Sequence, residues 1–284
     1  MEISIKNDGG VAELQEQKGR QMSIARHFCI FAIYLLFTPP FAAGQITAAD
    51  KAAITQCVVH DKKGETCIGI VADPCISAAN LNSYVEDAKA CAGRELAVWN
   101  EFLQASLTIV NASSPPAVRA AVAEAQSNWL KSRESSCPIF DDVEPGMYTG
   151  GANYCRLQET GRRALILECM SVSHDKKGRG ETCIEIVAGP CESAKREDPK
   201  ACAARKLAGW KKSLQGTLKG LKVHSALDLS EVQSNWLKSR EGLCSLFDII
   251  DPGVYGVGSD ACRLVETRGR DLILERLLEA VSEH

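Results

Sequence analysis

Twelve cysteines that recur in the same order in two successive segments constrain this chain most strongly. Each segment contains six of them, and they correspond one to one: Cys57, Cys67, Cys75, Cys91, Cys137 and Cys155 with Cys169, Cys183, Cys191, Cys202, Cys244 and Cys262. The second and third cysteines are 8 residues apart in both segments, and the fifth and sixth are 18 apart. Each segment is therefore expected to form a closed unit, most simply with three disulfides.

Repeated strings support this duplication. The nine residues Gln126–Glu134 return without change as Gln233–Glu241, and residues 60–68 return at 174–184 with a two-residue insertion. The four tryptophans correspond as well, Trp99 with Trp210 and Trp129 with Trp236. We therefore predict three parts: an N-terminal extension with a leader (1–44), a first copy (45–168) and a second copy (169–284).

The N-terminal part predicts export. Arg26 and His27 precede an apolar run over residues 28–37, which is followed by small residues up to Gly44. About ten apolar residues suit a cleaved signal peptide, whereas a membrane span, the alternative reading, needs about 20. We expect translation to start at Met22, cleavage near Ala43–Gln45, and a periplasmic or secreted mature chain with no membrane span.

Composition and cysteine usage narrow the possible functions. A formal net charge of −3 provides no basic excess for nucleic acid. Thirteen cysteines in the full chain indicate disulfides in an oxidising compartment or metal sites. Because no Cys-x-x-Cys occurs and histidines are few, we expect no metal and no cofactor. No nucleophile recurs beside a histidine, so an enzyme is not expected, although a wall-active hydrolase stays an alternative.

Apolar residues are spaced as in helices, and strand signals are nearly absent. Helices are expected over residues 48–59, 67–71, 85–111 and 153–172, with the second ended by Asp73-Pro74. Another helix, the fourth in chain order, is expected to open at Pro115-Pro116 after a cap at Ser113-Ser114 and to stop before Pro138. The fifth runs through Cys169, so the two copies are expected to share a helix. The predicted fold is all-α, with two tandem disulfide-stapled helical-bundle repeats.

One loop in each copy stands out. Residues 138–151 contain too many prolines and glycines for helix or strand, and their flanking cysteines, Cys137 and Cys155, are expected to bond. The same is expected of Cys244 and Cys262. Both loops contain Pro-Gly-x-Tyr, and their candidate partner-binding residues are Asp141, Asp142, Glu144, Met147 and Tyr148 with Asp248, Asp251 and Tyr255. The alternative is that each loop is only a stapled connection.

A second pattern joins Trp129, Arg133, Cys137, Cys155, Thr160 and Arg163, and it recurs as Trp236, Arg240, Cys244, Cys262, Thr267 and Arg270. This pattern, together with Cys91-x-x-x-Glu95-x-x-x-Trp99 upstream, resembles the LprI-type lysozyme inhibitor family. The second copy departs from it in having Lys206 where Glu95 stands. The resemblance implies a small exported helical domain and, for the family's namesake, binding and inhibition of lysozyme.

Two readings of the tryptophan–arginine pairs stay open. Trp129 and Arg133 share a helix face, so they could form a hot spot for a partner. Alternatively, the tryptophan belongs to the core and the arginine pairs locally. Trp99 and Trp210 are expected in the core.

The sequence as a whole predicts an exported, non-enzymatic binding protein, with lysozyme as the partner implied by the resemblance. Residues 57–168 contain 10 basic and 14 acidic side chains, whereas residues 169–284 contain 18 and 17. A basic lysozyme is therefore expected to approach the first copy more readily. The alternative is a structural or stress-related envelope protein that binds another protein or a wall fragment.

Overall fold

The computed structural model describes residues 46–61, 64–78, 84–143, 150–172, 198–224, 227–250 and 258–282. The expected leader, Cys183 and Cys191 lie outside these residues. All the described residues belong to one compact unit, residues Ala43–His284. They form helices and loops, which confirms the predicted all-α class. No helix in the described ranges is long and apolar enough to cross a membrane.

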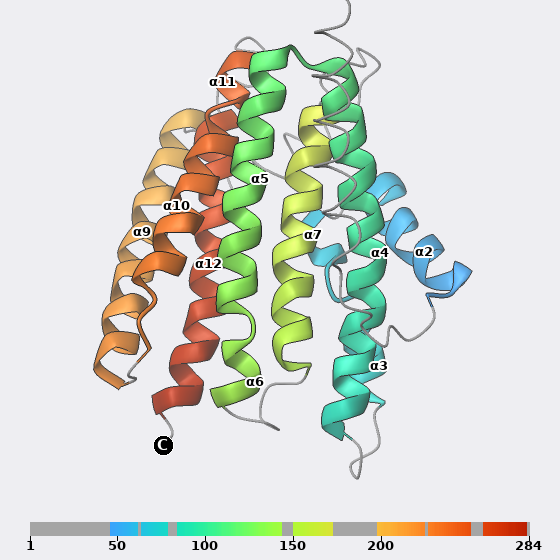
Figure 1. Cartoon of the computed structure of the whole chain (residues 1–284), viewed down its shortest axis with the longest axis vertical. Coiled ribbons are helices and arrows are strands. Elements are labelled where there is room, and N and C mark those ends of the chain that lie inside the picture. The colour runs from blue at the N-terminus through green and yellow to red at the C-terminus, as the bar shows by residue number, and fades with distance from the viewer. Residues whose placement is uncertain are drawn as a thin grey trace, which may run out of the picture. The chain divides into compact units, whose positions relative to one another are not determined.

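The first copy begins with short elements and continues with three long helices (Figure 1). The short elements are α2 (Ala48–Thr55), the π-helical η1 (Gln56–His60), the 3-10 helix η2 (Gly64–Cys67) and α3 (Ala72–Ser77). The long helices are α4 (Tyr84–Ser113), α5 (Pro116–Ser136) and α7 (Gly151–Val172), with α6 (Ile139–Val143) between the last two. Helix α7 runs through Cys169, as expected.

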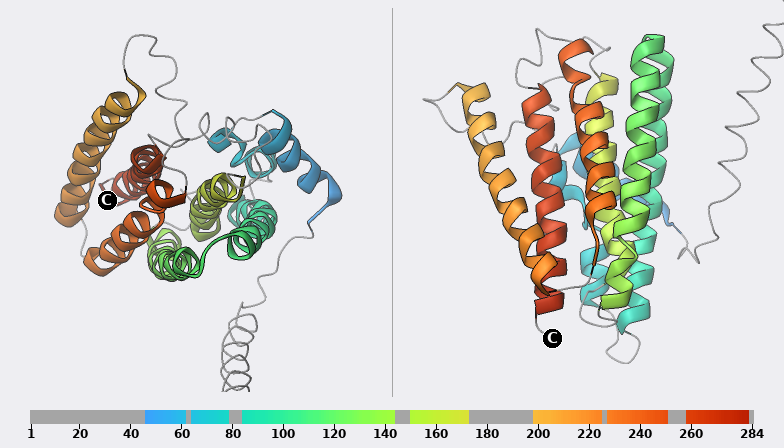
Figure 2. Two further views of the ribbon diagram at one scale, coloured as in Figure 1. Left: turned by 90° about the horizontal axis from the view of Figure 1, so that it is seen from above. Right: turned by 60° about the vertical axis from the view of Figure 1, so that its left-hand side comes forward.

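The second copy repeats the long helices. They are α9 (Pro199–His224), α10 (Ser230–Cys244) and α12 (Gly258–Ser282), with α11 (Phe247–Ile250) before the last. Seen from above, α5, α7, α10 and α12 lie between α9 on one side and α4 on the other (Figure 2). Helix α4 packs mainly on α7, α9 on α12, and α5 on α10.

Three local expectations are wrong. Residues 139–143 and 247–250 are short helices, although both were expected to be irregular. Pro74 does not end a helix but lies in the first turn of α3, where its missing N–H costs nothing. Ser114 does not cap α5, because that helix begins at Pro116 after Pro115, without a side-chain cap.

Four disulfides join described cysteines: Cys57–Cys67, Cys75–Cys91, Cys137–Cys155 and Cys244–Cys262. The last two are the pairs expected from the sequence. The first two tie the short N-terminal elements to each other and to α4, respectively. Cys202 is also disulfide-bonded.

The two copies share their cores. Phe247, Cys244 and Cys262 of the second copy pack in the cluster that contains Trp99 and Trp129 of the first. Reciprocally, Phe140, Cys137 and Cys155 of the first copy pack in the cluster around Trp236 and Leu274. Helices α5 and α10 run in opposite directions, because α6 follows α5 at the lower end of Figure 1 and α11 follows α10 at the upper end. The residues around the disulfide Cys137–Cys155 thus pack in the core of the second copy, and those around Cys244–Cys262 pack in the core of the first.

Candidate functional site

The candidate binding residues fall into two groups. Asp141 and Asp142 lie on α6, where Asp141 is half-buried and Asp142 exposed, and Asp248 lies exposed on α11. Glu144, Met147, Tyr148, Asp251 and Tyr255 lie outside the described residues. The structure therefore locates the beginning of each loop, and the roles of all these residues stay predictions.

Asp141, on α6 near the start of the first loop, contacts residues of the long helices α4 and α7. Its Oδ1 accepts a hydrogen bond from the backbone N–H of Ala152 at 3.2 Å and lies 3.3 Å from Nζ of Lys89 on α4. Nearby, Asn153 Nδ2 donates to the carbonyl of Lys89 at 3.0 Å. Helix α6 is thereby fixed to the first turns of α4 and α7.

Two consecutive glycines make this close approach possible. Gly150 and Gly151 have φ of +93° and +47°, a backbone region that favours glycine. A Cβ at Gly150 would lie 2.9 Å from Cβ of Tyr154, and a Cβ at Gly151 would collide with the Asp141 carboxylate. The pair therefore turns the chain into α7 where no side chain fits.

Tyr154, in the first turn of α7, connects the start of that helix to α3. Its hydroxyl donates to Asp73 Oδ1 at 2.8 Å, and the guanidinium of Arg276 lies 5.5 Å from its ring centroid. Burial and the hydrogen bond to the Asp73 carboxylate raise the pKa of Tyr154. The phenol therefore stays protonated at neutral pH and acts as a hydrogen-bond donor.

These elements together present an acidic surface. Asp73, Glu86 and Asp142 are exposed, and Asp87 and Asp141 are half-buried. They lie on α3, the first turn of α4 and α6, which meet at the lower end of the molecule in Figure 1. We call these five residues the acidic corner. Lys89 compensates part of its charge, so the corner favours a basic partner.

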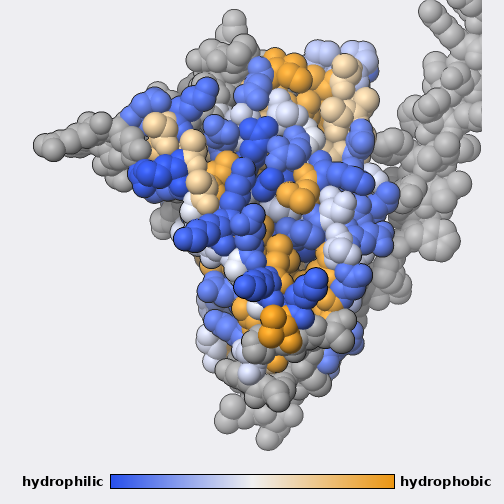
Figure 3. Space-filling model, turned by 90° about the vertical axis from the view of Figure 1, so that its left-hand side faces the viewer, coloured by the Kyte–Doolittle hydropathy of each residue, from blue (hydrophilic) through white to orange (hydrophobic). Residues whose placement is uncertain are grey.

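The equivalent corner of the second copy has a different surface. Ile249, which is 64% exposed, stands at the position of Asp142. Of the described acidic residues at this corner, Asp260 pairs with Arg263 at 3.3 Å and Asp248 is exposed. On the side of the molecule where α9 lies, hydrophilic side chains surround separate hydrophobic groups (Figure 3). The two copies therefore do not offer the same surface to a partner.

The tryptophan–arginine pairs lie inside the molecule. Trp129 and Trp236 are each 1% exposed, which favours the core reading over a partner hot spot. Arg133 lies 4.6 Å from the centroid of the Trp129 ring, and its Nη1 donates to Thr160 Oγ1 at 2.8 Å. Arg240, Trp236 and Thr267 repeat this arrangement with 4.8 Å and 2.9 Å.

Arg163 and Arg270, the other arginines of the recurring tryptophan–arginine pattern, contact residues of the opposite copy. The sequence did not predict these contacts. Arg163 Nη1 donates to Ser239 Oγ at 3.3 Å and lies 4.0 Å from Glu266, both in the second copy. Arg270 Nη1 makes the reciprocal contacts, with Ser136 Oγ at 3.2 Å and Glu159 at 3.8 Å.

These crossing charges are deeply buried. Burial lowers the pKa of Arg163 to about 10, and it lowers that of Arg270 as well. Burial also raises the pKa of Glu266, against the opposing effect of Arg163. Helices α5 and α10, which carry the unchanged nine-residue string, pack on each other beside these charges.

Among the described carboxylates of the first copy, Glu95 accepts the most hydrogen bonds from backbone N–H groups. It is fully buried and accepts hydrogen bonds from the backbone N–H groups of Gly69, Val71 and Ala72 at 2.7–2.8 Å. It also accepts from Trp99 Nε1 at 2.9 Å. Glu95 thus holds residues 69–72 against α4, and Lys206 in the second copy has no acceptor atom with which to repeat this.

Comparisons with known proteins address the family. Residues 75–167 match the family model described as lysozyme inhibitor LprI. No curated protein and no solved structure gives a significant match.

Within the described ranges, no group of three or more His, Cys, Asp or Glu side chains is placed to hold a metal ion. The matched residues run from α3 to α7 and include every residue of the acidic corner except Asp73.

Proposed function

Because residues 75–167 match the family model of lysozyme inhibitor LprI, we propose that this chain is an exported, non-enzymatic protein that binds and inhibits lysozyme. The family match is the observation that carries the proposal. The four disulfides support an extracytoplasmic location, because such bonds persist in oxidising compartments. Inhibition needs contact alone, which suits a stapled helical body.

We place the lysozyme-binding surface at the acidic corner of the first copy. It lies next to the disulfide Cys137–Cys155, and the Asp141 contacts hold it rigid, so little conformational freedom is lost on binding. Lysozymes are typically basic, and exposed carboxylates would attract them and orient their approach. The second corner has Ile249 in place of Asp142 and is proposed to contribute less.

The proposal is tested by adding purified oxidised chain, from about Gln45 onward, to c-type, g-type and i-type lysozymes acting on bacterial cell walls. We expect slower wall lysis with at least one type and co-elution of that lysozyme with the chain. Full lysis rates with all three types and no co-elution would overturn it.

The binding surface is tested with matched charge changes. Asp142→Lys reverses an exposed charge at the acidic corner, and Asp248→Lys makes the same change at the other corner. We expect Asp142→Lys to weaken inhibition by about tenfold at low salt, and Asp248→Lys to change it little. Equal effects of the two substitutions would place the contact elsewhere while leaving the inhibitor assignment intact.

A further inference from the structure

Helix α9 carries a large excess of positive charge. Its 26 residues include six lysines and one arginine and no aspartate or glutamate. Helix α4, which corresponds to α9 because it carries Trp99 where α9 carries Trp210, has two basic and four acidic residues. The formal charge is therefore +7 for α9 and −2 for α4. A nearly neutral chain thus contains a strongly basic helix.

Four of the lysines lie on the outer side of this helix. Lys211, Lys212, Lys219 and Lys222 are all exposed. At about 100° per residue they fall within about one third of the helix circumference, and the row from Lys211 to Lys222 is about 17 Å long. We call these four residues the lysine face. Lys200, also exposed, lies about three turns before Lys211 and extends the row.

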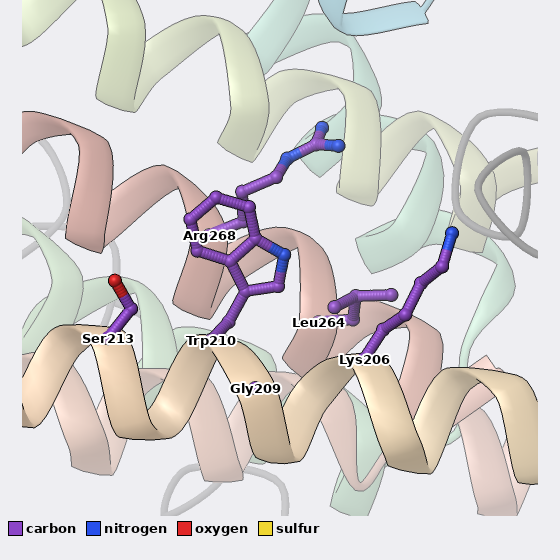
Figure 4. A pocket seen from close by; sticks show the side chains of 6 residues that line it. All are labelled: Lys206, Gly209, Trp210, Ser213, Leu264 and Arg268. Carbon is purple, nitrogen blue, oxygen red and sulfur yellow. The ribbon is translucent and has the colours of Figure 1, made fainter.

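The lysine face points away from the side of α9 that packs on α12. In Figure 4, the side chains of Lys206, Trp210 and Ser213 leave α9 on one side, where Leu264 and Arg268 of α12 also lie. By the same helical spacing, the lysine face occupies the opposite side of the helix. Its ammonium groups are therefore directed to the outside of the molecule.

Trp210, on the inner side, is half-buried and does not lie in the core as expected. The corresponding Trp99 is fully buried and donates its indole N–H to Glu95 at 2.9 Å. Lys206 stands at the position of Glu95 and has no acceptor atom for an indole N–H. The replacement of this glutamate thus removes a core contact and adds a positive charge to α9.

The corresponding side of the first copy is exposed as well. Asn100, Glu101, Thr108 and Asn111 stand at the positions of the four lysines, and all of them are exposed. The short elements before α4 therefore leave this side of the helix in contact with solvent. Four lysines in place of three neutral residues and one acidic residue change the charge of a solvent-exposed surface, which packing of the core does not explain.

Acidic side chains offset part of this charge. Asp228 lies near Lys222 in the turn after α9, where hydrogen bonds from Ser230 lower the pKa of Asp228 and Lys222 lowers it further. Glu275 and Glu279 are exposed on α12, the helix on which α9 packs. The lysine face and Lys200 together outnumber these three carboxylates, so the surface keeps an excess of positive charge.

We propose that the lysine face docks this chain on the surface of an anionic phospholipid bilayer. Lysine ammonium groups are point charges on flexible stems, which suit a surface with many phosphates and no fixed geometry. Clusters of four or more basic residues on one side of a helix are attracted to anionic leaflets. The chain would lie on the membrane without spanning it.

The shape of the surface favours a bilayer over a dissolved polyanion. The outer side of a helix is convex, whereas flexible charged polymers such as single-stranded nucleic acids are bound in grooves. Val223, which is 71% exposed beside Lys222, adds an apolar side chain that can enter the lipid interface. Because α4 lies on the other side of the bundle from α9 (Figure 2), docking would leave the acidic corner accessible. The inference does not depend on lysozyme binding.

Vesicle sedimentation with the oxidised chain from about Gln45 onward tests the proposal, because the apolar run before Gln45 could bind lipid by itself. The vesicles contain phosphatidylcholine alone or equal parts of phosphatidylcholine and phosphatidylglycerol, and dextran sulfate serves as a dissolved polyanion. We expect binding to the phosphatidylglycerol vesicles at low salt, loss of most of this binding at about 0.5 M sodium chloride, and no binding to phosphatidylcholine alone. Dextran sulfate with the same concentration of anionic groups should compete poorly.

The double variant Lys211→Gln/Lys222→Gln should weaken binding to the anionic vesicles about 30-fold. The matched control is Lys51→Gln/Lys131→Gln, which makes the same change in net charge at two exposed lysines of the first copy and should weaken binding less than about threefold. The proposal fails if the chain does not bind the phosphatidylglycerol vesicles or binds dextran sulfate more tightly than these vesicles. It also fails if the two double variants lose the same affinity while circular dichroism shows intact helices.

Discussion

At the scale of single residues, buried charged groups have the largest structural consequences. Glu95 satisfies three backbone N–H groups and one indole N–H without a cationic partner among these contacts. Arg163 and Arg270 pair across the two copies in a reciprocal arrangement. In both cases a charge is retained in the interior because it joins segments that are distant in the sequence.

Glu95→Gln should lower the free energy of unfolding by about 1–3 kcal/mol, because the amide group must turn one of its N–H donors toward backbone donors. Chemical denaturation followed by circular dichroism measures this. Glu101→Gln, at an exposed glutamate paired with Lys51, should cost less than about 1 kcal/mol. A loss at Glu95 as small as that at Glu101 would contradict the role of Glu95 in holding residues 69–72.

Glu266 should make stability depend on pH. Burial raises its pKa in the folded chain, so between the ordinary value of about 4.3 and the raised value the folded chain binds a proton that the unfolded chain has lost. Stability should therefore fall as pH rises through that window. Glu266→Gln should remove this decline, measured as the free energy of unfolding at successive pH values. Glu275→Gln, at an exposed residue of the same helix, should leave the decline unchanged.

At the scale of elements, the sequence predicted the long helices well and their connections poorly. Periodic apolar residues indicated the extents of α4, α5 and α7 to within a few residues. Helix α6 was missed because prolines and glycines surround it, and its five residues depend on the Cys137–Cys155 bond and on packing in the other copy's core. Such nonlocal support leaves no periodic signal in a single sequence.

The turn into α7 offers a sharp test. Gly151→Ala should destabilise the chain by about 1–3 kcal/mol, because alanine is strained at φ +47° and its Cβ would collide with Asp141. Gly216→Ala, in the middle of α9 with no neighbour near its Cβ position, should instead stabilise by about 0.5–1 kcal/mol. Thermal unfolding of the two variants should therefore shift in opposite directions, and a shared direction would refute this view of the turn.

At the scale of the whole molecule, the copies are interleaved instead of lying side by side as independent domains. The sequence predicted the duplication but not this exchange, because identical strings do not indicate which copy each one packs against. The boundary expected at residues 168 and 169 falls inside α7 and stays a proposal. A chain built in this way should unfold as one cooperative unit.

Leu243→Ala tests this cooperativity. Leu243 belongs to the second copy but packs, fully buried, in the core that contains Trp99 and Trp129. The substitution should cost about 2–5 kcal/mol and move the whole unfolding curve, with circular dichroism and tryptophan fluorescence still coincident. Two separate transitions, of which only one shifts, would show that the copies unfold independently.

The most direct test of lysozyme binding at the acidic corner is amide hydrogen exchange of the oxidised chain with and without the lysozyme that it inhibits. We predict slower exchange on binding in α3, the first turn of α4 and α6, and little change in α9 and α11. Protection confined to the second copy, or no protection anywhere in the presence of saturating lysozyme, would contradict binding at this corner.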